Sequence, residues 1–442
     1  MNIVTSIIGA FKPKSLARDM ITTTSYSIIG KGIGFLVPFF IATWYGVSAQ
    51  TDGFFFTYGI ILFLAGIVAP VIENVIVPYI AEFSSQNKSV NHFIGSLLVI
   101  STIILCLFFI PFAFLVKPGL AFVTRFDIAN RHLVYVLLLE TFPLVIFLTW
   151  TSILSGTLNA YKQFGIPAIS PAIRAIVNLA IIFILKDVWG VHAIAIGYVL
   201  GELFRIIFLL IVIYRSKLFF PVLNFNFDQK IREFIHTASY QTFGMIAAGL
   251  MSVIDKTMAS WLSTGSVSIL EYANRLYDIP LSFMYTGFIV ILLSHWSSRY
   301  YEFGIKRLNE DLIKTSKVII PLTLFITIIL ISFHAPLVNL AYNRGSFNPD
   351  ALSAVGRIWC YYLIGLCPFF FVQLFNRRYL VLRKTKILLW LAVLWNILKI
   401  FLNLLFIPLM NVEGIALSTS ILFIMASVIL FILFKRENAH AK

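Results

Sequence analysis

Single positive charges stand inside otherwise apolar stretches of this chain. Four of them are Lys31, Arg174, Arg275 and Lys399. A cation at the centre of a membrane span costs about 2.5–3.5 kcal/mol, so it needs an acidic partner, a water-filled cavity or an anionic ligand. An excess of buried cations would attract a phosphorylated headgroup and repel a hydrophobic cation. The pattern therefore favours binding of an anionic substrate over covalent chemistry.

Acidic residues in the same stretches decide how many of these cations are already neutralised. Glu202 lies three positions before Arg205, so we expect these two side chains to pair on one helix. Asp255 and Lys256 are adjacent and point in different directions, so we do not expect them to neutralise each other. Asp255 and Glu73 are candidates for coupling to an ion or for balancing the charge of an empty cavity.

Lys31 is the cation with the simplest surroundings. No acid lies three or four positions away, and the residue is embedded in the sequence Gly30-Lys-Gly-Ile-Gly34. A glycine-rich turn that binds phosphates follows a strand in a soluble unit, whereas these glycines lie inside an apolar stretch. The spacing of Gly30 and Gly34 instead favours close packing of helices. We therefore expect Lys31 to face a water-filled cavity.

The composition is that of a membrane protein. Of the 442 residues, 60% are hydrophobic and 12% are charged, and the mean hydropathy is +0.92. Stretches of about 20 apolar residues, long enough to cross the hydrocarbon layer, recur along the chain. We expect twelve spans, at residues 21–45, 54–81, 91–116, 132–158, 166–186, 191–214, 234–262, 269–298, 316–341, 351–381, 386–408 and 412–434. The shorter alternating segments of a spanning barrel are not seen in the sequence.

The chain also contains an internal repeat. Residues 190–215 align without gaps on residues 411–436, and the same offset places Asn178 on Lys399. We expect an all-α integral membrane protein of two six-helix lobes around a central cavity, as in a transporter whose lobes rock against each other. The expected parts are an interfacial segment (1–20), an N-terminal lobe (21–215), a cytoplasmic linker (216–233), a C-terminal lobe (234–436) and a tail (437–442).

The formal net charge of +15 is distributed unevenly. Lys and Arg gather in alternate loops, and by the positive-inside rule this pattern makes both termini and the linker cytoplasmic. The basic balance is therefore explained mainly by topology, with attraction to anionic membrane lipids as a secondary effect. Nucleic acid is not an expected partner.

Residues for other chemistries are sparse in the sequence. Cys106, Cys360 and Cys367 fall inside expected spans, without a close pair or histidines at metal-ligand spacing. Hydrolytic triads and nucleotide-binding motifs are not found either. We expect no catalytic residue, no metal and no cofactor, and thus not an enzyme.

A series of short motifs runs along nearly the whole chain. The motifs are Asp52-Gly-Phe-Phe, residues 156–171 (Gly-Thr-Leu-Asn-Ala-Tyr-Lys-Gln-Phe-Gly-Ile-Pro-Ala-Ile-Ser-Pro), Asp255-Lys-Thr-Met-Ala-Ser, Tyr272-Ala-Asn-Arg-Leu-Tyr-Asp-Ile-Pro280, Asn343-Arg-Gly-Ser-Phe347 and Asn403-Leu-Leu-Phe-Ile-Pro408. In this order and spacing they resemble the MviN/MurJ lipid II flippase family, within the multidrug/oligosaccharidyl-lipid/polysaccharide exporter superfamily.

The resemblance implies alternating access that moves an undecaprenyl-diphosphate-linked saccharide from the inner to the outer leaflet of the bacterial inner membrane. It implies that Lys31, in place of the family's first-helix arginine, and Arg275 line a cationic cavity. Asp52 matches the family's acidic residue beside the first outer loop. The expected partners are the anionic lipid-linked substrate and membrane lipids, with envelope-synthesis enzymes as candidates.

The chain also departs from the family pattern. Val37 stands where the family has a second arginine on the first helix, and the apolar run Phe63-Leu-Ala-Gly66 stands where it has a basic doublet. The family's two additional C-terminal helices are not expected here. Three alternatives stay open at this point: a flippase for O-antigen or another polysaccharide unit, an ion-coupled antiporter of small molecules from the same superfamily, and a membrane scaffold without transport activity.

Overall fold

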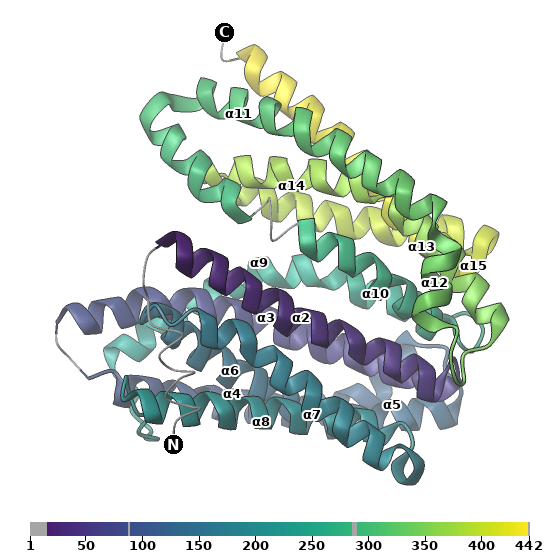
Figure 1. Cartoon of the computed structure of the whole chain (residues 1–442), viewed down its shortest axis with the longest axis horizontal. Coiled ribbons are helices and arrows are strands. Elements are labelled where there is room, and N and C mark those ends of the chain that lie inside the picture. Colours follow the sequence, from purple (N-terminus) through teal and green to yellow (C-terminus); the bar gives the residue numbers. More distant parts are fainter. Residues whose placement is uncertain (1–15, 87–88, 285–289, 441–442) are drawn as a thin grey trace. The chain divides into compact units, whose positions relative to one another are not determined.

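The computed structural model describes residues 16–86, 89–284 and 290–440 (Figure 1). Within these ranges the chain folds into helices and no strand is found. The helices are α2 (Leu16–Tyr45), α3 (Ala49–Ser85), α4 (Asn91–Val123), α5 (Ile128–Thr141), α6 (Pro143–Ala160), α7 (Gly165–Trp189), α8 (His192–Ser216), α9 (Gln229–Ala259), α10 (Ser266–Met284), α11 (Val290–Ser332), α12 (His334–Tyr342), α13 (Pro349–Ile364), α14 (Leu366–Val381) and α15 (Thr385–His440). A helix satisfies every backbone polar group inside the segment, as lipid requires.

Nine helical stretches of the described residues are long and apolar enough to cross a membrane. They contain or overlap ten of the expected spans, because the stretch Lys386–Glu437 includes both 386–408 and 412–434. The other two expected spans fall on α9 and on α10 with the start of α11, and part of the latter span lies outside the described residues. The prediction of an all-α membrane protein is confirmed.

Two of the long helices are broken by a single residue in a non-helical conformation. Gly304 has φ 74° and ψ −172° inside α11, and Asn411 has φ 50° and ψ −132° inside α15. The first break lies in the connection expected between the spans 269–298 and 316–341, and the second lies between the last two expected spans. Each long element therefore supplies parts of two spans.

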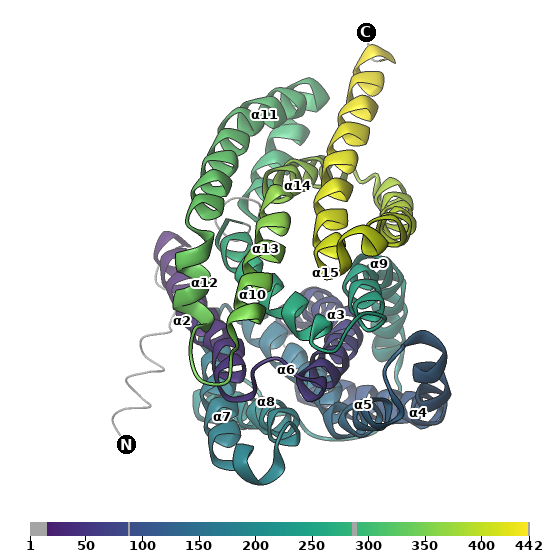
Figure 2. The ribbon, with the colours of Figure 1, turned by 90° about the vertical axis from the view of Figure 1, so that its right-hand side faces the viewer.

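The described residues form two compact units. Unit 1 runs to Trp44 and resumes at Ala49–Val253, and unit 2 consists of Tyr45–Ser48 and the chain from Ile254. In unit 1, α7 packs on α8 and α3 packs on α6. In unit 2, α14 packs on α11 and α15, and Figure 2 shows α13 beside α15. The lobe boundary expected at 216–233 rests on the sequence repeat and stays a prediction.

The two copies of the repeat have the same backbone turn. Gly190 ends α7 with φ 52° and ψ −133°, almost the same angles as those of its aligned residue Asn411. Asn178 and Lys399, which the alignment also pairs, are 1% and 0% exposed. The repeat predicted from the sequence is therefore present in the backbone and in the burial of its aligned polar residues.

Close packing of α7 on α8 depends on glycine. A Cβ atom at Gly201 would lie 2.7 Å from the carbonyl oxygen of Arg174, and one at Gly197 would lie 2.5 Å from Oδ1 of Asn178. Small residues four positions apart let helix backbones approach in lipid, where no hydrophobic effect drives helices together. The contact positions Arg174 against the face of α8 that carries Glu202.

The connection between α8 and α9 is held against the start of α4. The backbone N–H of Phe220 donates to Oδ1 of Asn91 at 2.9 Å, and that of Val222 donates to the carbonyl oxygen of Asn91 at 3.1 Å. Gly95 permits this approach, because a Cβ atom there would collide with the carbonyl group of Val222. This part of the connection is thus fixed to unit 1.

The first turn of α9 is anchored in the same unit. The backbone N–H of Ile231 donates to the Asp228 carboxylate at 2.9 Å. Nζ of Lys230 lies 2.7 Å from the carboxylate of Glu82 on α3, and this hydrogen bond raises the pKa of Lys230 above its ordinary value. The protonated form of Lys230 therefore links α9 to α3.

Substitutions at the two aligned turns test the cost of their conformation. A residue with a Cβ atom is strained by about 1–3 kcal/mol at these angles, whereas glycine adopts them freely. We therefore expect Asn411→Gly to raise the midpoint of thermal unfolding of the purified protein in detergent, and Gly190→Ala to lower it. Asn411→Ala should also lower the midpoint, since asparagine tolerates positive φ better than alanine. A lower midpoint for Asn411→Gly would contradict the assignment of strain.

Candidate functional site

A buried carboxylate holds two arginines in unit 1. Glu202 on α8 is 0% exposed, and its side chain lies 3.4 Å from Nη1 of Arg174 on α7 and 3.1 Å from Nη1 of Arg205. The hydroxyl of Thr151 on α6 donates to the same carboxylate at 2.6 Å, and Nε of Arg205 donates to Ser170 at 2.9 Å. The pairing of Glu202 with Arg205 that the sequence predicts is confirmed, and Arg174 joins it.

Glu73 provides a second acid near this cluster. It lies on α3, accepts a hydrogen bond from the side-chain amide of Asn159 on α6 at 3.1 Å and interacts electrostatically with Arg205. Together with Glu202 it supplies two negative charges for the two arginines. The expectation that Glu73 balances charge is consistent with this position, and its part in transport stays a prediction.

Arg275 belongs to a second ionic cluster, in unit 2. Its guanidinium group lies 2.5 Å from Glu271 and 3.4 Å from Asp278, both on the same helix α10. Nζ of Lys256 on α9 lies 2.8 Å from Glu271 as well. Sequence reasoning missed these acids, although their positions four before and three after Arg275 are the spacing at which helical neighbours meet.

Lys399 is enclosed by oxygen atoms in unit 2. Its side chain is 0% exposed, and Nζ lies 3.1 Å from the Asp255 carboxylate. The ammonium group also donates to the carbonyl oxygen of Ile415 at 2.9 Å and to the hydroxyl of Thr419 at 2.5 Å. Asn403 donates to the same carboxylate at 2.9 Å. Each of the three ammonium hydrogens can therefore bind an oxygen atom of the protein.

As expected, Asp255 and Lys256 do not neutralise each other, since each pairs with a residue of another helix. Asp255 pairs with Lys399 of α15, and Lys256 pairs with Glu271 of α10. A direct contact of Lys399 with a substrate would require its oxygen cage to open. The predicted role of Lys399 in binding therefore stays a prediction that depends on a change of conformation.

Lys31 differs from the other three predicted cations. Its side chain is exposed on α2, and no ion pair of Lys31 is found among the described residues. The adjacent Gly30 is buried, and a Cβ atom there would lie 2.6 Å from the carbonyl oxygen of Ala168 on α7. In the described part of the chain no atom lies within 4 Å of where the Cβ of Gly34 would be, so the predicted close contact is seen at Gly30 and not at Gly34.

Asp52 lies in the first turn of α3 and is 2% exposed. A carboxylate at this position is favoured by the unsatisfied N–H groups and the dipole of the helix N-terminus. Its place therefore has a structural explanation in addition to the role that the family resemblance implies.

Among the described residues, three of the four predicted cations thus lie in separate ionic clusters, and Lys31 stands apart from them. In unit 1 the Glu202 cluster leaves the Arg174 side chain 30% exposed, and in unit 2 the Glu271 cluster leaves the Arg275 side chain 21% exposed. No group of three or more His, Cys, Asp or Glu side chains that could hold a metal is found in the described part of the chain.

Removing the buried carboxylate of Glu202 tests how far its cluster stabilises unit 1. Glu202→Gln leaves two arginines without the negative charge that compensates them. Breaking a buried ion pair in this way costs about 3–5 kcal/mol, so we expect a clear loss of thermal stability in detergent. Asp187→Asn is the matched control, because Asp187 pairs with Lys186 at 2.8 Å but its side chain is 80% exposed. An exposed pair contributes about 0–1 kcal/mol, so equal effects of the two substitutions would refute the expectation.

A double-mutant cycle tests the Lys399 cage. Lys399→Met leaves the Asp255 carboxylate without its cation, and we expect a lower unfolding midpoint. Lys399→Met combined with Asp255→Asn removes both charges and should recover part of the loss, because residues in contact are energetically coupled. Additive effects of the two substitutions would show that the pair is not coupled.

Comparison with known proteins places the chain in a family. A family model described as lipid II flippase MurJ matches residues 41–442. A probable lipid II flippase MurJ of Rickettsia prowazekii is 25% identical over 417 residues, which is 92% of this chain and 81% of that protein. The lipid II flippase MurJ of Burkholderia cenocepacia is 23% identical over 96% of this chain and 85% of its own length.

Two solved structures have the same fold. A lipid II flippase MurJ in an inward closed conformation superposes with a TM-score of 0.78 at 23% identity and covers 95% of this chain and 87% of that one. A multidrug resistance MATE family transporter of the MOP superfamily, in an inward-facing conformation, gives a TM-score of 0.77 at 13% identity, over 95% of this chain and 98% of that one. At such identities these likenesses show the fold alone. The family model, which covers nearly the whole chain, shows that this protein belongs to the MurJ lipid II flippase family, whose members are membrane transporters and not enzymes.

Proposed function

We propose that this multi-pass inner-membrane protein moves an undecaprenyl-diphosphate-linked saccharide, a lipid II-like precursor of peptidoglycan, from the inner to the outer leaflet by alternating access. Its family membership supports the substrate class and the reaction, which changes the position of a lipid and no covalent bond. The proposal includes the cytoplasmic location of both termini, which the distribution of Lys and Arg supports. Association with envelope-synthesis enzymes remains a candidate property.

The observation that carries the proposal is the exposed ammonium group of Lys31 on α2. No acid among the described residues pairs with it, and a cation within an apolar span requires a partner of opposite charge or water. A diphosphate group supplies that partner, and hydrogen bonds between charged groups contribute about 1.5–3 kcal/mol. Lys31 is therefore the proposed first contact of the diphosphate.

Arg174 and Arg275 are the next proposed contacts. Each is partly exposed while paired with an acid, and each is proposed to exchange part of that pairing for phosphate oxygens. Lys399 is proposed to contact the substrate only in a state in which its bonds to Asp255, Ile415 and Thr419 are broken. Asp255, Glu73 and Asp52 are proposed to balance positive charge while the site is empty.

Complementation tests the substrate and the direction. A bacterial host depleted of its own lipid II flippase should regain growth and outer-leaflet lipid II when this chain is expressed. The chain could instead fail in this host at a normal expression level and restore growth in a host that lacks its O-antigen flippase. The proposed substrate would then be a polysaccharide unit and not lipid II. Efflux of small soluble compounds driven by an ion gradient, without either lipid activity, would indicate an antiporter.

Substitution of Lys31 tests the cationic site within the same assay. Lys31→Ala should abolish complementation at a normal protein level, because the loss of one charge-assisted contact lowers affinity about 10–100-fold. Lys31→Arg keeps the charge and should retain activity. Lys306→Ala is the control, since Lys306 is an exposed lysine on α11. Full activity of both Lys31→Ala and Arg275→Ala would rule out the proposed contacts.

A further inference from the structure

An imidazole and a carboxylate link two helices of unit 1 beside the turn between α7 and α8. Nδ1 of His192, the first residue of α8, lies 2.9 Å and 2.8 Å from the two carboxylate oxygens of Glu140 on α5. The two side chains are partly exposed and lie at the end of two spanning helices, so protons can reach them from that side of the membrane. Neither residue belongs to the three ionic clusters or to the proposed transport contacts.

The second copy of the repeat has a pair at the corresponding place. Glu413 aligns with His192, and its carboxylate lies 2.6 Å from Nε of Arg357 on α13. The N-caps of α5 and α13, Asp127 and Asn348, stand at the same offset in the repeat, so these two helices correspond to each other. Each unit therefore links the helix that follows the turn to the same neighbour through one acid and one base.

The two pairs differ in how they respond to pH. A guanidinium group stays protonated throughout the range in which proteins work, so Arg357 and Glu413 attract each other at every such pH. An imidazole changes its charge between about pH 5 and 8, and only its protonated form adds a charge to the hydrogen bond with a carboxylate. The pair of His192 and Glu140 is thus stronger at acidic pH and becomes weaker as the pH rises.

The position of His192 at the start of a helix makes this pair depend on Glu140. The N-terminal end of a helix carries a partial positive charge, which favours a carboxylate and disfavours a cation. In unit 2 this field favours Glu413, whereas in unit 1 it opposes the protonated form of His192. Without the carboxylate of Glu140, protonation of His192 would therefore destabilise the start of α8.

Glu140 is the one acid within hydrogen-bond distance of His192 in the described part of the chain. α8 packs on α5, α6 and α7. On α7, Lys186 and Asp187 stand at this end and pair with each other at 2.8 Å, and α6 has no ionisable side chain. The nearest other titratable side chains of α5 and α8 stand more than one helical turn from the pair along the sequence, and they are Arg131, His132, Tyr135, Tyr198 and Glu202.

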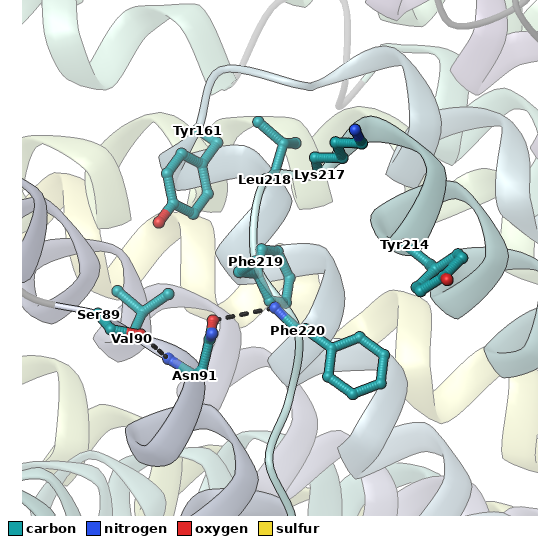
Figure 3. A pocket seen from close by; sticks show the side chains of 9 residues that line it. All are labelled: Ser89, Val90, Asn91, Tyr161, Tyr214, Lys217, Leu218, Phe219 and Phe220. Atoms are coloured by element: carbon teal, nitrogen blue, oxygen red, sulfur yellow. Dashed lines mark hydrogen bonds between the residues drawn. The ribbon is translucent and has the colours of Figure 1, made fainter.

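The opposite end of α8 is held by a different kind of contact. There the backbone N–H of Phe220 donates to the side-chain oxygen of Asn91 at 2.9 Å, a bond that Figure 3 shows as a dashed line. This bond joins two amide groups, so its strength does not change with pH. One end of α8 is therefore held by an amide contact and the other by a titratable pair.

We propose that the pair of His192 and Glu140 is a proton-sensitive link, which strengthens the packing of α8 on α5 when the medium on that side of the membrane is acidic and weakens it when the medium is alkaline. The corresponding pair in unit 2 keeps its strength, so pH changes one unit and not the other. With the cytoplasmic termini proposed above, the link lies on the outer side of the membrane. That assignment of the side rests on the proposed function, whereas the link itself does not.

Thermal unfolding of the purified full chain in detergent, at pH 5.5 and at pH 8, measures the link. His192→Gln keeps a donor for Glu140 and removes the titratable charge. We expect it to lower the unfolding midpoint by about 2–4 °C at pH 5.5, the effect of one charged hydrogen bond in a domain of this size, and by clearly less at pH 8. An equal loss at both pH values would overturn the proposal, and so would the absence of a loss at either.

Substitution of the acid reverses the expected sign. In Glu140→Gln the protonated His192 has no carboxylate beside it, so at pH 5.5 the double variant Glu140→Gln with His192→Gln should unfold at a higher temperature than Glu140→Gln alone. Arg357→Gln is the matched control in unit 2, and its loss should be the same at both pH values. A loss in Arg357→Gln that follows pH as that of His192→Gln does would overturn the proposal, because the response would then not come from the imidazole.

Hydrogen exchange locates the effect within unit 1. After correction for the intrinsic exchange rates, peptides from α5 and from the start of α8 should be less protected at pH 8 than at pH 5.5 in the wild type, and equally protected in His192→Gln. Unchanged protection in the wild type would overturn the proposal. None of these measurements uses transport, so their outcome is independent of the substrate that the protein carries.

Discussion

A charge inside a membrane has no water to stabilise it, and this constraint organises both units of the protein. Lipid supplies no hydrophobic force that presses helices together, so close packing and polar contacts must hold them. Glu202 joins α8 to Arg174 of α7 and to Thr151 of α6, and Lys399 joins α15 to Asp255 of α9. The ionic clusters therefore contribute to the packing of helices as well as to the electrostatics of a possible binding site.

The four cations differ in how far the protein already compensates their charge. The ammonium group of Lys399 is bound by three oxygen atoms. Arg174 and Arg275 are each paired with an acid and partly exposed, and Lys31 is exposed. Among the described residues Lys31 has no acid to release before it binds an anion. At Lys399 a phosphate would have to replace the Asp255 carboxylate, so that acid opposes binding there.

Sequence reasoning predicted the helices well and one of the contacts within a helix. Hydropathy identified the apolar stretches, and helical spacing identified the pair of Glu202 and Arg205. It could not reveal that Asp255 meets Lys399, because these residues are far apart in the chain and periodicity describes only neighbours on one helix. Hydropathy also did not show the breaks at Phe333 and Gly365, since a bend in the backbone leaves the apolar character of a span unchanged.

The oxygen atoms around Lys399 and the hydrogen bonds between the α8–α9 connection and Asn91 could not be predicted for the same reason. Both depend on which helices pack together, and one sequence without an alignment carries little information on that question. The acids around Arg275 are different: Glu271 and Asp278 stand at helical spacing in the sequence and could have been found. Their spacing from Arg275, four residues before and three after, is enough to predict both pairs on one helix.

The matching turns at Gly190 and Asn411 also bear on the history of the chain. Two copies of a duplicated segment have kept one backbone geometry while their residues changed, and in the second copy the geometry persists although asparagine is less suited to it than glycine. The turn therefore keeps its shape in both copies, although glycine stands in one and asparagine in the other. A superposition of the structures of relatives should show a positive φ kept at this position while the residue varies.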